Sequence, residues 1–309
     1  MRALGIKFAN SISCQNTFNQ VGFFDKLNKL DTNSEALVPN YKNLFQPSQL
    51  RRMSPILKAG LSLAISCKKA CRAPFDSIII GTGLGCLTDT GKFLQNINLK
   101  TGDSLSPTSF IQSTHNTIAG QISILLNNKG YNMTHSQNNL SFEMSLLDAM
   151  TEINEGKRSI LVGGIDEAHP FLEEIKNRVV TKTYPNTLSA AFFVLDKADH
   201  QQTVQIKSVY TDFSSDSINP FIERVCKEGN IDFNQIDLVL HSGINSTLVA
   251  QHARSMNYLD YTGYNLSSSA LATHFAYDFL KHNPNKTALI INHLCTSKSA
   301  IFIETNDQA

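Results

Sequence analysis

Short apolar runs alternate along the chain with longer stretches in which apolar residues recur at helical spacing. The short runs predict strands at Ala3–Phe8, Ser77–Ile80, Ser159–Val162, Ala190–Leu195, Val204–Tyr210, Leu238–Leu240, Ala288–Ile291 and Ala300–Ile303. The longer stretches predict helices at Pro47–Lys69, Thr88–Ile97, His115–Asn127, Leu140–Glu155, Pro220–Glu228, Ser246–Met256 and Ser267–Lys281. This alternation is typical of an α/β protein.

The order of the predicted elements repeats loosely along the chain. The strand that leads into Gly81-Thr82-Gly83 has a counterpart in the strand that leads into His241-Ser242-Gly243, and each part closes with two further strands. Strands that are apolar throughout need cover on both faces. The repeat therefore predicts two similar halves, residues 1–200 and 201–309, stacked in one compact unit as a duplicated five-layer α-β-α-β-α fold.

Composition and charge exclude several classes of protein. With 41% hydrophobic and 17% charged residues, the 309-residue chain is neither disordered nor collagen-like. Lys and Arg total 27 against 26 acidic residues, so the net charge of +1 creates no overall field toward nucleic acid or anionic membrane. No apolar run approaches the ~18–20 residues that span a bilayer, and Met1–Lys7 is too mixed for a secretory signal. We expect a cytoplasmic protein without a membrane span.

The cysteines and histidines do not indicate a metal site. Cys67 and Cys71 are the closest approach to a ligand motif, but no second pair of ligands accompanies them. No His-x-x-x-His pair with a nearby carboxylate occurs among the nine histidines. Cys295 lies near His293 between the last two predicted strands, where a Cys–His nucleophile could be assembled, although neighbours in sequence rarely have that geometry. Cys295 is the less favoured candidate nucleophile.

Two glycine-rich segments follow predicted strands. Gly81–Gly85 superficially resembles a dinucleotide loop, but Cys86 stands where the third glycine is needed, so we expect no cofactor. Gly163-Gly164 is as readily a feature of the fold as of a site. Asp166 and Glu167, which follow it, are expected to be solvated or capping residues rather than a catalytic acid pair.

Four stretches taken together resemble the β-ketoacyl–acyl carrier protein synthases, the condensing enzymes of the thiolase fold. The stretches are Gln49–Met53, Ile80–Gly85, Ser106–Gly120 and Ile160–Glu167. Their order and spacing match that family over nearly the whole chain. The resemblance implies a thiolase-like architecture.

The resemblance also implies where catalytic residues should lie. The family uses a cysteine at the tip of a buried helix, together with two histidines. The cysteine position falls at Asn139, in a window of Gln137 to Asn139 that holds no cysteine, and Phe142 replaces a small residue behind it. The histidine positions fall at Ser242, beside His241, and at Tyr264. The closing loop, residues 292–299, contains no glycine. The scaffold motifs thus persist while the catalytic positions are degenerate.

Such chains resemble chain-length factors, inactive subunits that pair with an active ketosynthase and shape its acyl tunnel. The resemblance implies a heterodimer in type II polyene, polyketide or fatty-acid-like biosynthesis, with a carrier-protein-bound acyl chain as the ligand. By analogy alone, the length and divergence suggest aryl polyene or flexirubin systems. His115, Ile118 and Ile122 are the expected tunnel residues, and the dimer is expected across the strand near Met133–Ser136 and the helix His115–Asn127.

Three alternatives remain open from the sequence. The chain could pair with itself as a homodimer. It could be a divergent active acyltransferase or decarboxylase that uses Cys295 or a shifted His241. It could also be a scaffold module that keeps the dimer surface of the fold but binds no acyl chain.

Overall fold

The computed structural model describes residues 2–71, 73–99, 106–169, 184–198, 204–214, 216–294 and 297–305. Its strands are β1 (Leu4–Ile12), β2 (Ser77–Gly81), β3 (Tyr131–His135), β4 (Ile160–Asp166), β5 (Ser189–Lys197), β6 (Val204–Asp212), β7 (Leu238–His241), β8 (Ser255–Asn257), β9 (Thr287–Leu294) and β10 (Ser297–Thr305). Its helices are α1 (Pro47–Leu50), α2 (Pro55–Ala70), α3 (Leu87–Leu99), α4 (Pro107–Gln112), α5 (Thr117–Leu126), α6 (Ser141–Asn154), α8 (Ile218–Gly229), α9 (Thr247–Gln251), α10 (Leu259–Thr262) and α11 (Ser268–His282).

The sheet is built from two equivalent halves. The strand order is β3-β2-β4-β5-β1-β6-β10-β9-β7-β8. In one half, β2 is parallel to β3 and β4, and β5 is antiparallel to β4 and β1. The other half repeats this arrangement: β7 is parallel to β8 and β9, and β10 is antiparallel to β9 and β6. The pairs Leu4↔Ile206 and Gly5↔Gln205 join the halves. The boundary at residue 200 stays a prediction, because residues 199–203 lie outside the described part of the chain.

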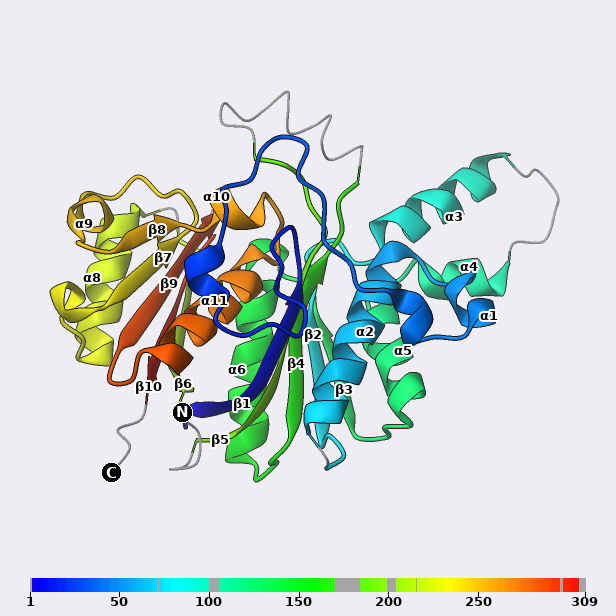
Figure 1. The fold of residues 1–309 in the computed structure, drawn as a ribbon, viewed down its shortest axis with the longest axis horizontal. Coiled ribbons are helices and arrows are strands. Elements are labelled where there is room, and N and C mark those ends of the chain that lie inside the picture. Colours follow the sequence, from blue (N-terminus) through cyan, green and yellow to red (C-terminus); the bar gives the residue numbers. More distant parts are fainter. Residues whose placement is uncertain are drawn as a thin grey trace.

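Three buried apolar clusters alternate with the two half-sheets. In β2, Ile78 and Ile80 face a cluster with α2 and α5, whereas Ile79 faces the central cluster with α6 and α11. In β9, Ile290 faces that central cluster, and Leu289 faces a third cluster beneath α8 and α9. Figure 1 shows these layers in succession, from α8 and α9 on the left to α2 and α5 on the right. The predicted five-layer architecture is confirmed.

Several predicted helix boundaries are wrong. The stretch predicted as one helix, Pro47–Lys69, is split into α1 and α2, because Pro55 restricts Ser54 to an extended conformation (ψ 165°). The predicted helix Ser246–Met256 ends at Gln251, and the chain then enters β8. The strands β3 and β8 and the short helices α4 and α10 were not apparent from the apolar pattern, because these elements are short or half-exposed.

The glycines of β4 permit close packing on both faces of this strand. A Cβ atom at Gly163 would lie 2.3 Å from Cδ1 of Phe192 on β5, and one at Gly164 would lie 2.5 Å from Cβ of Ala270 on α11. The close approach of neighbouring side chains therefore requires glycine at both positions. This favours the interpretation of Gly163-Gly164 as a feature of the fold rather than of a site.

Replacing Gly163 should disrupt this packing. Gly163→Ala is expected to lower the free energy of unfolding by about 1–3 kcal/mol, because the Phe192 ring must shift within a filled core. Gly120→Ala is the matched control: no heavy atom lies within 4 Å of its added Cβ, and alanine is favoured over glycine in a helix by about 1 kcal/mol. Urea unfolding of both variants checks this, and equal stability of the two would contradict it.

Candidate functional site

A sharp turn leads from β3 into α6. Asn138 adopts a left-handed conformation (φ 52°) at the start of the 3₁₀ turn Asn138–Leu140. The hydroxyl of Ser141 accepts a hydrogen bond from the backbone N–H of Gln137 (2.9 Å) and donates one to the carbonyl of Asn138 (2.7 Å). Asn139 therefore lies at the tip of a buried helix. This is the place where the family resemblance predicts a nucleophile.

Asn139 is enclosed, and both polar atoms of its side chain form hydrogen bonds. Its side chain is 1% exposed; Oδ1 accepts from Ser297 Oγ (2.9 Å), and Nδ2 donates to the carbonyl of Ser297 (3.3 Å). Its own carbonyl accepts from Nδ2 of Asn292 on β9 (2.8 Å). The amide therefore links α6 to the β9–β10 hairpin, and it has no thiolate or hydroxyl that could attack a thioester.

A buried carboxyl group lies one helical turn farther along α6. Oε1 of Glu143 accepts hydrogen bonds from Asn292 Nδ2 (3.1 Å) and Ser299 Oγ (2.7 Å), while Oε2 has no partner among the described residues. Oδ1 of Asn292 accepts from the hydroxyl of Tyr258 (3.1 Å). Burial raises the pKa of Glu143, against the opposing effect of the bonds from Ser299 and Asn292, and so favours the neutral carboxyl.

We call this group the junction cluster, because it joins α6 to strands of the other half. Its members are Asn139, Glu143, Tyr258, Asn292, Ser297 and Ser299. The importance of Glu143 was missed in the sequence. The available signal was a glutamate at helical spacing between Leu140 and Leu146, both of which are buried.

The two predicted histidine positions lie in different surroundings. Ser242, at the end of β7, is buried, and its Oγ accepts a hydrogen bond from the backbone N–H of His293 (2.8 Å), the residue after Asn292. Ser242 is therefore brought beside the junction cluster. Tyr264 follows α10, and its backbone N–H donates to the carbonyl of Pro185 (2.8 Å). Neither position supplies an imidazole.

The acidic residues after the second glycine pair are buried, so the expectation that they are solvated is wrong. Asp166 accepts hydrogen bonds from the backbone N–H groups of Gly83 and Leu84 (both 2.9 Å), and Glu167 accepts one from Thr88 in the first turn of α3 (2.8 Å). Burial raises the pKa of both groups. The loop that superficially resembles a dinucleotide site thus binds the carboxylate of Asp166 from its own chain. Glu167 caps the first turn of α3, so the expectation of a capping residue is met at this position.

The expected tunnel residues divide into two kinds. Ile118 and Ile122 are fully buried in the cluster between α2 and α5, so their contacts are those of core residues. His115 is exposed and lies in the turn before α5, because this helix begins at Thr117 rather than at His115. The tunnel role itself stays a prediction.

The described cysteines are free thiols: Cys14, Cys67, Cys71, Cys86 and Cys226. Burial raises the pKa of Cys14 to about 11 and raises that of Cys86, which disfavours the nucleophilic thiolate. Cys295 lies outside the described residues. Within the described ranges, no group of three or more His, Cys, Asp or Glu side chains could hold a metal ion, and no helix is long and apolar enough to cross a bilayer.

Comparison with known proteins identifies the family. Residues 28–220 match the model of the β-ketoacyl synthase N-terminal domain. The chain therefore belongs to the β-ketoacyl synthase family. Comparison with curated proteins gave no significant match.

Solved structures confirm the thiolase-like ketosynthase fold. The ishigamide ketosynthase/chain length factor shares 14% identity, covers 98% of this chain and 99% of its own, and gives a TM-score of 0.79. AntDE:AntF, a type II acyl-carrier protein with its ketosynthase, shares 15% identity over 99% and 100% of the chains, with a TM-score of 0.80. The ketosynthase ApeO with its chain length factor ApeC, from Xenorhabdus doucetiae, shares 21% identity over 70% and 85%, with a TM-score of 0.56.

Ionisation of Glu143 should be visible in the pH dependence of stability. A raised folded-state pKa contributes stability below the unfolded value near 4.5, and that contribution is lost as pH rises through the folded pKa. Glu143→Gln keeps the shape and the acceptor oxygen but does not ionise. The free energy of unfolding of the Glu143→Gln variant, minus that of the wild type, should therefore increase with pH. The increase should be up to about 1.4 kcal/mol per pH unit.

Urea unfolding of both proteins between pH 4 and 8 measures this difference. Subtracting the two curves removes the shared contributions of Asp166 and Glu167, whose pKa values are also raised by burial. A difference that does not change with pH would show that Glu143 ionises equally in both states.

Proposed function

We propose that this chain is a non-condensing, chain-length-factor-like subunit that pairs with an active ketosynthase in cytoplasmic type II polyene, polyketide or fatty-acid-like biosynthesis. The observation that carries the proposal is Asn139, which occupies the tip of α6 and is enclosed by Ser297 and Asn292. Aryl polyene and flexirubin pathways are the particular systems we propose for it, on analogy alone.

Condensation needs groups that this site does not supply. The family's reaction forms a thioester on a cysteine and uses two histidines to stabilise developing charge. Here the corresponding residues are an amide, a buried hydroxyl at Ser242 and a phenol at Tyr264. The acyl chain would accordingly be held by the partner's cysteine, and this subunit would bound the tunnel.

The isolated protein should not condense acyl and malonyl units carried on acyl carrier protein. The Asn139→Cys variant should remain below the detection limit as well, because a thiol alone restores neither imidazole. Product formation is measured by mass spectrometry of the carrier proteins. Turnover by the wild type that is abolished in Cys295→Ala would contradict the proposal and favour a divergent acyltransferase.

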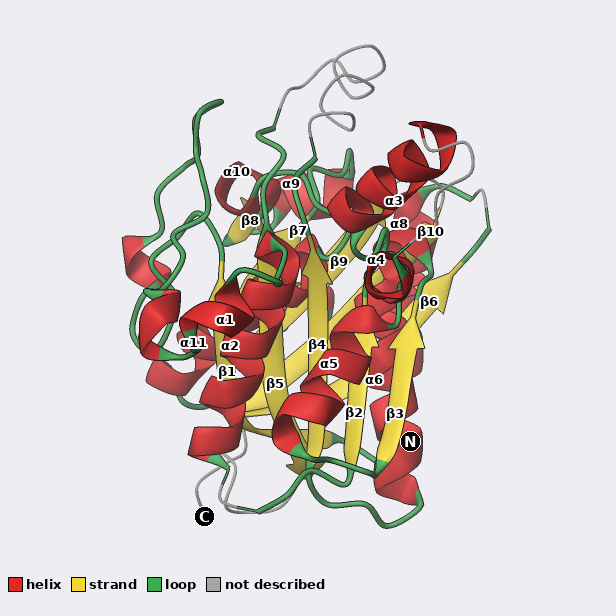
Figure 2. Ribbon diagram, turned by 90° about the vertical axis from the view of Figure 1, so that its right-hand side faces the viewer, coloured by secondary structure: helices red, strands yellow, loops and turns green. Residues whose placement is uncertain are grey.

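Apolar side chains are exposed on the edge strand β3 and on the helices α4 and α5. β3 ends the strand order, and Met133 on it is 38% exposed; nearby elements expose Ile124 on α5 (74%) and Phe110 (57%) and Ile111 on α4. Figure 2 shows β3 at the edge of the sheet beside α5. We call these four residues the partner face. An edge strand and exposed apolar side chains both favour association.

We propose that this face binds an active ketosynthase, with a second copy of this chain as the alternative occupant. Known structures of this fold include a ketosynthase paired with a chain length factor. A stable interface of this kind buries more than about 2,000 Å². Of the three expected tunnel residues, we propose that exposed His115 faces the partner's acyl chain, while Ile118 and Ile122 support its helix from the core.

Charges introduced on the partner face should weaken the complex. Combining Met133→Lys with Ile124→Glu is expected to raise the dissociation constant at least tenfold, because the complex must then desolvate two unpaired charges. Phe213→Ser, which removes an equally exposed ring (65%) beyond the end of β6, is the control and should bind normally. Gel filtration with ketosynthases encoded nearby checks this; a wild-type chain that stays monomeric with every such partner would contradict it.

A further inference from the structure

A basic pocket of about 580 Å³ lies at the end of α6 remote from the junction cluster. Four cationic residues line it, Arg2, Lys157, Arg158 and Lys197, together with one acidic residue, Asp196. Ile153, Gly156 and Ala198 complete its lining. Since α6 has 14 residues at about 1.5 Å per residue, roughly 21 Å separates this pocket from Asn139.

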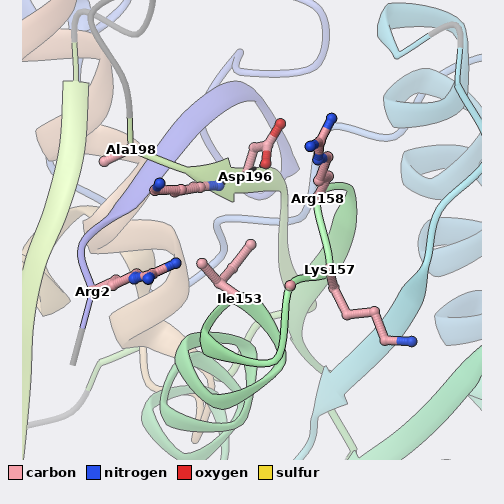
Figure 3. Close-up of a pocket in the computed structure, with 8 residues that line it drawn as sticks. Arg2, Ile153, Lys157, Arg158, Asp196 and Ala198 are labelled. Atoms are coloured by element: carbon pink, nitrogen blue, oxygen red, sulfur yellow. Dashed lines mark hydrogen bonds between the residues drawn. The ribbon is translucent and has the colours of Figure 1, made fainter.

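Three segments that are distant in sequence build the pocket. Arg2 precedes β1, Lys157 and Arg158 lie in the turn between α6 and β4, and Lys197 ends β5. Figure 3 shows Arg2 and Arg158 on opposite sides of Ile153, with the ammonium group of Lys157 directed away from it. The two arginines that line the pocket thus come from two separate segments.

The turn after α6 is held rigidly. Gly156 has a positive φ of 97°, its N–H donates to the carbonyl of Ile153 (3.1 Å), and the N–H of Lys157 donates to the carbonyl of Glu152 (3.1 Å). The carboxylate of Asp76 accepts the N–H of Arg158 (2.9 Å). Backbone hydrogen bonds therefore hold the turn that carries Lys157 and Arg158.

The cations of this pocket have no ion-pair partner in the part of the chain that the structure describes. Asp196, the acidic residue of the lining, is already paired with Lys7. Cations after a helix complement its C-terminal dipole, which accounts for Lys157 and Arg158. The helix dipole does not account for Arg2, which precedes β1, or for Lys197, which ends β5. In a chain of net charge +1, this is a local concentration of charge.

We propose that this pocket binds a small molecule that carries a diphosphate group, held mainly by Arg2, Arg158 and Lys197. Guanidinium groups bind phosphate oxygens in a bidentate manner, and an ammonium adds a point charge. The volume lies in the range of small-molecule sites and exceeds what a single phosphate fills. This proposal does not rest on the proposed partner or on the state of Asn139.

Calorimetric titration with inorganic pyrophosphate tests the proposal, with orthophosphate as the matched smaller anion. At low ionic strength, pyrophosphate should bind at one site per chain and at least tenfold more tightly than orthophosphate. The double variant Arg158→Gln with Lys197→Gln should weaken pyrophosphate binding at least tenfold. Lys227→Gln, an exposed and unpaired lysine at the end of α8, should leave it within twofold.

Thermal unfolding of each variant confirms that it is folded, since all substituted side chains are exposed. Equal weakening by Lys227→Gln would show nonspecific attraction and overturn the proposal. So would the absence of saturable pyrophosphate binding up to millimolar concentration. Tight binding of polyglutamate that depends on Arg158 and Lys197, without pyrophosphate binding, would assign the pocket to an acidic protein segment instead.

Discussion

The central helices α6 and α11 lie between two half-sheets, and this two-sided burial is the constraint on which the rest of the structure depends. Almost every residue of α11 is buried, including the ionisable side chains of His274, Tyr277 and Asp278. His274 shares a hydrogen bond with Ser11 Oγ (2.8 Å), and Asp278 accepts the N–H groups of Gly22 and Phe24 (2.7 and 2.9 Å). A buried polar group without a partner is costly, so His274 and Asp278 each tie another segment to the centre.

The same constraint explains the junction cluster on α6. A carboxyl group at Glu143 is tolerated inside the protein because burial favours its neutral form and because Asn292 and Ser299 donate to it. Asn292 in turn bonds to Asn139 and Tyr258. Burial also lowers the pKa of His274 to about 3, so this imidazole is neutral and structural rather than an acid or a base in chemistry. The position at which the family resemblance predicts a nucleophile, Asn139, is here a hydrogen-bonded part of the core.

The features that suggest binding lie instead at the periphery. The partner face includes Met133 on β3, which has a single neighbouring strand, β2, among the described residues. The basic pocket lies where α6 ends, so one helix connects the junction cluster at its start with a charged depression at its end.

The sequence by itself determined the layered α/β class, the duplication and the family. Strands such as β2 and β9 are apolar on both faces because helices cover both, and that property is local in the sequence. A strand near Met133–Ser136 was expected from the family resemblance and not from the apolar pattern, because this half-exposed segment gains its order from pairing with β2. Only the tertiary structure decided that Asn139 meets Ser297, and that residues 2, 158 and 197 share a pocket. Such contacts join residues far apart in the chain, and hydrophobic periodicity records only which face of each element is buried, not what it meets.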